Sequence, residues 1–179
     1  HLVKMFMNAE LLKNLKITLL IIMVIISISS YAQQKSRVII EHADSYRYNA
    51  RIDKDVQRLI GNVVIRQDST LFYCDSAYIN EIKNSFASFN NVHIKVNDTI
   101  DVYGDRLLYD GNTRIAELFD SVKLVDKNTI LRTNHLIYNR LTKTAFYDIG
   151  GIIENGDNIL NSLIGIYYTK IRTFHFRKD

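Results

Sequence analysis

The chain has no proline, no tryptophan and a single cysteine among its 179 residues. One cysteine excludes an internal disulfide framework. This residue, Cys74, stands inside an internal repeat, at a position that later copies fill with Gly104 and Thr133. We therefore interpret Cys74 as a small strand residue, not as a nucleophile or a metal ligand.

The sequence also lacks a large excess of positive or negative charge. The formal net charge is +4, and three lysines and one glutamate lie before residue 33. Without that segment the net charge is about +2, which is too small to indicate a nucleic acid partner. We expect no nucleic acid binding.

The chain has one long hydrophobic run, the 13 residues ITLLIIMVIISIS at positions 17–29. Lys13 and Lys16 precede it, and Ser30 and Ala32 supply small residues before a cut at Gln33. This order is typical of a secretory signal peptide, and the run is too short for a permanent transmembrane helix. With no cysteine near the cut, no lipid anchor is predicted. We expect residues 1–32 to be an upstream extension and signal peptide, cut after Ala32, and residues 33–179 to be exported.

The remainder is rich in residues that suit a pleated sheet, including 11 Tyr and 8 Phe in the whole chain. A segment of one pattern recurs four times: DSYRYN (44–49), DSAYIN (75–80), DRLLYD (105–110) and NHLIYN (134–139). The first residues of these copies step by 31, 30 and 29 positions. Such a period is typical of stacked supersecondary units.

Short alternating segments recur between these copies: NVVIRQ (62–67), NVHIKV (91–96), SVKLVD (121–126) and GIIENG (151–156). Period-two alternation predicts strands with one buried face. Turn-forming residues predict reversals between strands at six places: Gly61-Asn62, Asn90-Asn91, Asn97-Asp98, Gly150-Gly151, and residues 110–112 and 155–157. No helix is expected after residue 32. The sequence predicts an all-β, repeat-built stack of short antiparallel strands.

These motifs resemble those of the OstA-like family of periplasmic lipopolysaccharide-transport proteins, whose members carry A-D-x-L-x-Y-D and G-N-V-x-I. The matching stretches are ADSYRYN (43–49), IGNVVI (60–65), FNNVHI (89–94), GDRLLYD (104–110), FDSVKL (119–124) and TNHLIYN (133–139). The resemblance implies a V-shaped, open β-jelly roll over residues 33–179. Its apolar interior would hold the acyl chains of lipid A, and the protein would lie in the periplasm.

The resemblance also implies partners. These are lipopolysaccharide itself, other OstA-like jelly-roll domains of the transport machinery joined through strand edges, and an end-to-end homo-oligomer. No cofactor is implied. The candidate lipid-binding residues are those of the apolar columns: Val63, Ile65, Ile79, Val92, Ile94, Leu107, Tyr109, Val122, Leu124, Leu136, Tyr138 and Ile153.

An alternative is a secreted structural β-solenoid, a scaffold or adhesin-like array that binds no lipid. Sequence periodicity is the same whether two sheets pack as a dry core or stay apart around a ligand. A carbohydrate-processing β-helix is a weaker third interpretation, because it needs a cluster of carboxylates on one face, which the columns do not show. Residues 157–179 restart the pattern without a polar cap, which indicates either a longer natural chain or a subunit that covers this end. Of the two we expect the longer chain, with the domain truncated at its C-terminus.

Catalysis and metal binding have little support in the sequence. His42, His93, His135 and His175 share no metal-ligand spacing. The column Asp44, Asp75, Asp105 and Asn134 has the chemistry of cation ligands, but Asp and Asn also bond to nearby backbone at turns. We favour the turn interpretation, and we predict neither an enzyme nor a metal protein.

Overall fold

The computed structural model describes residues 15–18, 20, 36–48 and 55–177. The chain divides into two units, residues 1–35 and 36–179. The described residues of the first unit are helical, and no helix in the described part of the chain is long and apolar enough to cross a membrane. The predicted cleavage after Ala32 lies outside the described residues.

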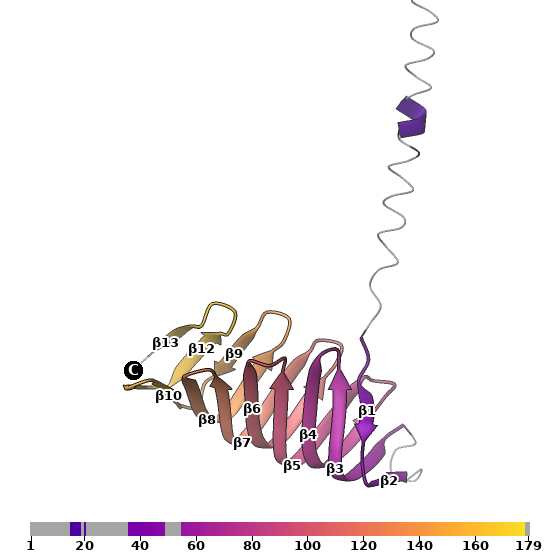
Figure 1. The fold of residues 1–179 in the computed structure, drawn as a ribbon, viewed down its shortest axis with the longest axis horizontal. Helices are drawn as coiled ribbons and strands as arrows, with labels where there is room; N and C mark the ends of the chain where they lie inside the picture. Colours follow the sequence, from indigo (N-terminus) through magenta and orange to yellow (C-terminus); the bar gives the residue numbers. More distant parts are fainter. Residues whose placement is uncertain (1–14, 19, 21–35, 49–54, 178–179) are drawn as a thin grey trace, which may run out of the picture. The chain divides into compact units, whose positions relative to one another are not determined.

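The second unit consists of β-strands that form a single antiparallel sheet (Figure 1). In chain order the strands are β1 (Ile39–His42), β2 (Ser45–Tyr48), β3 (Gln57–Gln67), β4 (Thr70–Asn80), β5 (Ser85–Val96), β6 (Ile100–Asp110), β7 (Ile115–Asp126), β8 (Thr129–Asn139), β9 (Thr144–Tyr147), β10 (Gly151–Asn155), β11 (Asn158–Ser162), β12 (Ile164–Tyr168) and β13 (Thr173–Arg177). Strands β3 to β8 pair in sequence order. β1 and β13 stand at the two ends of the strand order, so the sheet does not close on itself.

Each long strand bends at its middle, and the bend divides the sheet into two layers. The register shifts there between Ile60 and Val63 of β3, and the same shift recurs in every pair of neighbouring strands up to β7 and β8. We call the bends corners. Layer A holds β1, β10, β11 and the strand halves 63–67, 70–74, 92–96, 100–104, 122–126 and 129–133. Layer B holds β2, β9, β12, β13 and the halves 57–60, 76–80, 85–89, 106–110, 115–119 and 135–139.

The corners of β3, β5 and β7 are β-bulges with left-handed backbone. In β5, Asn90 and Asn91 have φ of 62° and 50°, and the corners of β3 and β7 also have two such residues each. Two bulge residues oppose one residue of the next strand, for example Asp105 opposite the Asn90-Asn91 pair. Asn tolerates this conformation better than most residues, which is why it recurs at these positions.

The Asp or Asn residue that opens each copy of the repeat lies at these corners. The Nδ2 atom of Asn91 donates to the Oδ2 atom of Asp75 at 2.8 Å, and Asn62 donates in the same way to Asp44 at 2.9 Å. The expectation that this column bonds its own nearby backbone is therefore wrong for these two residues, which accept hydrogen bonds from the corner of a neighbouring strand.

The Asn or Asp residue that ends each copy of the repeat lies where the turns of layer B begin. The Oδ1 atoms of Asn80, Asp110 and Asn139 accept hydrogen bonds from the backbone N–H groups of Lys83, Asn112 and Leu141, at 2.9, 2.8 and 2.9 Å. These are Asx-type turns. The backbone bonding expected of the first column is therefore found in this second one.

Three of the predicted strand reversals are wrong. Gly61-Asn62 and Asn90-Asn91 are corners inside β3 and β5, and Gly150-Gly151 is the bend between β9 and β10. The chain was expected to reverse its direction at these segments, but it continues in the same direction into the other layer. The remaining three signals, near residues 97, 111 and 156, do lie between strands. The second unit is an all-β, open jelly roll of two layers, as predicted.

Candidate functional site

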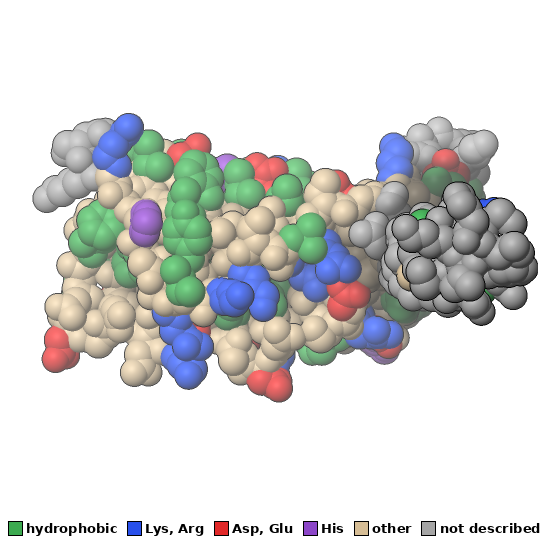
Figure 2. Space-filling model, turned by 90° about the horizontal axis from the view of Figure 1, so that it is seen from above, with side chains coloured by type: hydrophobic (Ala, Val, Ile, Leu, Met, Phe, Trp, Pro, Cys, Tyr) green, Lys and Arg blue, Asp and Glu red, His purple; other side chains and the backbone are tan. Residues whose placement is uncertain are grey.

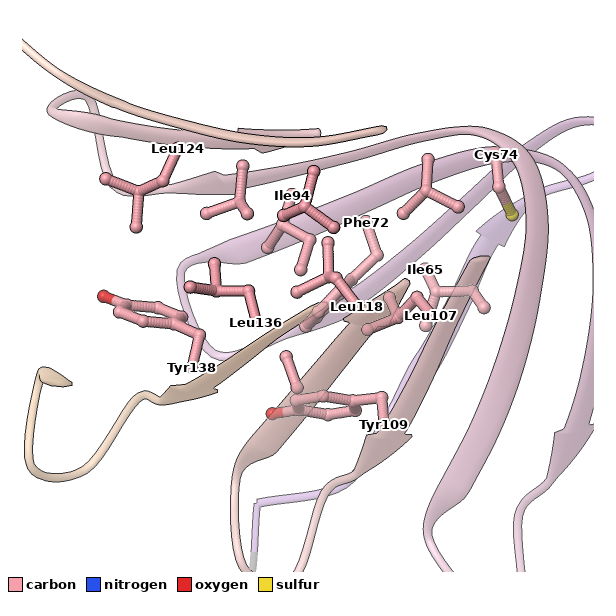
Figure 3. Close-up of a cluster of buried hydrophobic side chains, with 14 of the residues drawn as sticks. Ile65, Phe72, Cys74, Ile94, Leu107, Tyr109, Leu118, Leu124, Leu136 and Tyr138 are labelled. Atoms are coloured by element: carbon pink, nitrogen blue, oxygen red, sulfur yellow. The ribbon is translucent and has the colours of Figure 1, made fainter. Parts of the chain in front are cut away.

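The apolar interior lies between the inner faces of the two layers. All twelve candidate residues belong to its core cluster, with exposed fractions from 0% for Ile65 to 6% for Ile153. Figure 3 shows Ile94 and Leu124 pointing from one layer toward Leu118 and Leu136 of the other. The predicted inner face is therefore one continuous surface. In this structure the described side chains of this face are buried against one another in one core cluster.

Aromatic side chains join the two layers at the centre of this interior. The ring of Phe72, from layer A, lies 5.0 Å from Phe86 and 4.6 Å from Tyr109, both from layer B. Such ring pairs add about 0.5–1.5 kcal/mol beyond the burial of their area. These ring contacts attract the two layers to each other across the interior, whereas the corners join the layers covalently.

The side of the unit opposite the corners carries the hairpin turns of both layers, and we call it the mouth. In Figure 1 the turns lie along the upper side and the corners along the lower side. The inner face ends at the mouth in polar groups. In layer A these are Gln67 and Asp126, which are 0% and 1% exposed. In layer B they are the hydroxyls of Tyr109, Tyr138 and Tyr167.

The first set of polar contacts across the mouth is the Gln67 cluster, made by Gln67, Tyr109 and Arg140. The Tyr109 hydroxyl donates to the Oε1 atom of Gln67, and Arg140 donates to the same oxygen at 3.0 Å. The Nε2 atom of Gln67 donates to the Gly111 carbonyl and to the Ser36 carbonyl, each at 2.9 Å. One buried amide thus connects both layers and the segment before β1.

The second set is the Asp126 cluster, made by Asp126, Tyr167 and Arg172. The Tyr167 hydroxyl donates to Oδ2 of Asp126 at 2.8 Å, and the Nε atom of Arg172 donates to Oδ1 at 3.2 Å. A buried carboxylate needs such partners, because an unpaired charge in the interior costs several kcal/mol. The two clusters join layers A and B at two places along the mouth.

The mouth tyrosines have altered acidity. Burial raises the pKa of Tyr109, although the Arg140 guanidinium opposes this effect. Burial also raises the pKa of Tyr138, and burial together with the hydrogen bond to Asp126 raises the pKa of Tyr167. These hydroxyls stay protonated and available as donors at neutral pH.

The sequence interpretation missed the mouth. Gln67 and Asp126 share the parity of the apolar columns, two residues after Ile65 and Leu124, so period-two alternation alone places them on the inner face. Arg140 and Arg172 lie in the turns that follow β8 and β12, and no local pattern marks them as inner residues. Tyr167 continues the column of Tyr109 and Tyr138 at the same step of 29 residues.

The other candidates with chemical groups have ordinary structural surroundings. Cys74 is buried in β4, and burial raises the pKa of its thiol, so it is a poor nucleophile. His93 lies on the outer face of layer A, stacked 4.5 Å from the Tyr103 ring, and its Nε2 atom is 2.6 Å from Asp101. His135 lies on the outer face of layer B, 2.9 Å from Glu117.

Fold and interior together define the class: an open β-jelly roll with an apolar interior between two layers that are joined at the corners. The sequence profile of the OstA-like protein family matches residues 35–179, and the chain belongs to that family. No curated protein matches the chain. Among solved structures, the chain is similar to LptH from Pseudomonas aeruginosa, described as the LptA-homologous periplasmic component of the conserved lipopolysaccharide transport device. That likeness has 15% identity and a TM-score of 0.47, and it covers 82% of this chain and 85% of LptH.

Proposed function

We propose that this chain is a periplasmic component of lipopolysaccharide transport, and that the acyl chains of lipid A bind between layers A and B. Two observations support the proposal: membership of the OstA-like family, and two facing apolar surfaces that are joined covalently only at the corners. The family resemblance implies transport proteins and no enzyme activity.

The filled interior sets a condition on this function. Because the candidate residues pack against one another, the layers must separate at the mouth before an acyl chain can enter. The acyl chain would then pack against each inner face in place of the opposite layer, and its own burial would contribute about 0.8 kcal/mol per methylene. The corners are the natural hinge, since their bulges already interrupt the ladder of hydrogen bonds.

We further propose that the strand edges carry the partners. Strands β11 and β13 end the two layers at one end of the unit, and β1 and β2 end them at the other. An unpaired edge offers backbone groups that a further strand can bond. Exposed side chains on β11 and β13, Ile159 at 72% and Phe176 at 48%, would be covered by another jelly-roll domain or by a second copy of the chain.

A structural β-array that binds no lipid is the second candidate, and the filled interior favours it. In that case the layers would stay closed and the interior would be a dry core. The two candidates differ in one measurable property, the presence of lipid between the layers.

The experiment places a photocrosslinking amino acid at Leu124 on the inner face, or at Lys123 on the outer face, in cells that make lipopolysaccharide. Leu124 is 0% exposed, and Lys123 is its neighbour on the opposite side of β7. We expect a lipid A adduct from position 124 and none from position 123. A folded protein that gives no adduct at 124, or equal adducts at both positions, would favour the structural array.

A further inference from the structure

A cavity of about 370 Å³ opens at the mouth, between the Gln67 and Asp126 clusters. Its layer A wall comes from the turns at 68–70 and 97–100. Its layer B wall comes from the turns that follow β6, β8 and β12. Tyr138 and Ile100 lie at its walls and also belong to the apolar core. The cavity is thus the point where the interior meets the outside.

The cavity is strongly basic. Five cationic side chains and one carboxylate, that of Asp68, line it; the cations are Arg114, Arg140, Lys143, Lys170 and Arg172. Asp68 lies 3.2 Å from Arg114 and 3.7 Å from Arg140, and Arg172 bonds Asp126. No ion pair joins Lys143 or Lys170 to any described residue. Figure 2, which looks onto the mouth, shows several Lys and Arg side chains near the middle of this face.

Two buried donors at the cavity lack a partner. The Nε atom of Arg140 and the hydroxyl of Thr70 make no hydrogen bond within the described structure. The side chain of Arg140 is 7% exposed, and Thr70 is 1% exposed. Native proteins pair nearly all such groups, because a buried donor without an acceptor costs about 1–3 kcal/mol. Donors of this kind indicate an acceptor-rich ligand.

Three of the cations also occupy an unfavourable backbone conformation. Arg114, Lys143 and Arg172 are each the last residue of a layer B turn, with φ of 59°, 57° and 52°. Asn84 has the corresponding place in the preceding turn, with φ of 56°. Asn adopts this conformation more readily than Lys or Arg. A positive charge therefore replaces the better turn residue in each layer B turn that borders the cavity.

We propose that this cavity binds a phosphate group, held by Arg140, Thr70 and the lysines, at the head of the amphiphile whose acyl chains enter between the layers. The proposal rests on the proposed function. A phosphate presents several acceptor oxygens, and arginine binds it through parallel charge-assisted hydrogen bonds. In the structure the Asp68 carboxylate sits beside the arginines as a competing anion.

The experiment measures the affinity of the full chain for three probes: lipid A with both phosphates, dephosphorylated lipid A, and inorganic phosphate. The variant Lys143→Gln with Lys170→Gln removes two exposed cavity cations, and Lys95→Gln on the outer face of β5 is its matched control. We expect the double variant to bind phosphorylated lipid A about tenfold more weakly, with no change for the dephosphorylated form. The control should match the wild type.

The variant Asp68→Asn gives a result that misfolding cannot imitate. Loss of the competing carboxylate should tighten binding of phosphorylated lipid A several-fold and leave the dephosphorylated form unchanged. Equal affinities of wild type, double variant and Asp68→Asn for phosphorylated lipid A would overturn the proposal. Binding of inorganic phosphate without any preference between the two lipids would assign the cavity to the free ion and overturn the head-group assignment. If neither lipid binds, the transport proposal fails, whereas inorganic phosphate still tests the cavity separately.

Discussion

At the scale of single residues, the tyrosine hydroxyls under the mouth control the response to alkaline pH. Burial raises the pKa of the mouth tyrosines Tyr109, Tyr138 and Tyr167 above the ordinary value of 10.0, and it does the same for Tyr103 and Tyr147 elsewhere in the sheet. Below pH 10 these groups are protonated in both the folded and the unfolded chain. Above it the unfolded chain releases protons that the folded chain retains. The free energy of unfolding should therefore fall, by up to about 1.4 kcal/mol per pH unit for each tyrosine.

Urea unfolding across this range, followed together with tyrosinate absorbance, measures the effect. The variant Tyr167→Phe removes one titrating group and should make the decline in stability less steep. A folded protein that ionises all of its tyrosines near pH 10 without losing stability would contradict this account.

The core residues define a second prediction at this scale. Leu124 is 0% exposed and packs in the centre of the interior, whereas Leu141 is 58% exposed in a layer B turn. Leu124→Ala should lower the free energy of unfolding by about 2–5 kcal/mol, because it leaves a cavity among packed side chains. Leu141→Ala should change it by less than about 0.5 kcal/mol. Equal effects in urea unfolding would mean that the interior is not packed as described.

At the scale of elements, the corners allow one strand to continue from one layer into the other. Asn90 has φ of 62° and is exposed, so its side chain contributes little packing. Asn90→Gly should leave stability nearly unchanged, because Gly adopts this conformation without strain. Asn90→Val should cost about 1–2 kcal/mol, because a β-branched residue does not fit left-handed backbone. Comparing the urea midpoints of the two variants tests the corner directly, and similar midpoints would contradict it.

The elements also show how far the sequence alone could lead. Alternation predicted the strands and their inner faces, because the period of two is a property of any pleated strand. It could not distinguish a corner from a reversal: Gly61-Asn62 and Asn97-Asp98 look alike, yet only the second lies between strands. The difference depends on pairing with the next strand, which a local pattern does not contain.

At the scale of the whole molecule, the same limit applies to the site. The apolar columns could be predicted because each is a local pattern repeated along the chain. The Gln67 cluster could not, since its hydrogen bond from Arg140 to Gln67 joins residues 73 positions apart. Whether the interior is open or filled depends on the distance between two layers, and side-chain volumes across both layers set that distance. The contacts at the mouth therefore form only when both layers are folded against each other, and a local sequence pattern does not predict them.

A change in the Asp126 cluster should alter how readily the two layers separate. The carboxylate of Asp126 is 1% exposed and bonds both Tyr167 and Arg172, so it holds the mouth closed at one end. Asp126→Asn should weaken the contact with Arg172 and speed the uptake of a fluorescent lipid A several-fold, at a stability cost of about 1–3 kcal/mol.

Two controls isolate the mouth from general loosening. Asp98→Asn removes a carboxylate whose side chain is 99% exposed, and it should leave uptake unchanged. Leu124→Ala lowers stability in the interior without touching the Asp126 cluster. If uptake accelerates equally in Leu124→Ala and Asp126→Asn, lipid enters through general unfolding of the layers. If only Asp126→Asn accelerates it, the layers open at the mouth, with the corners as the hinge.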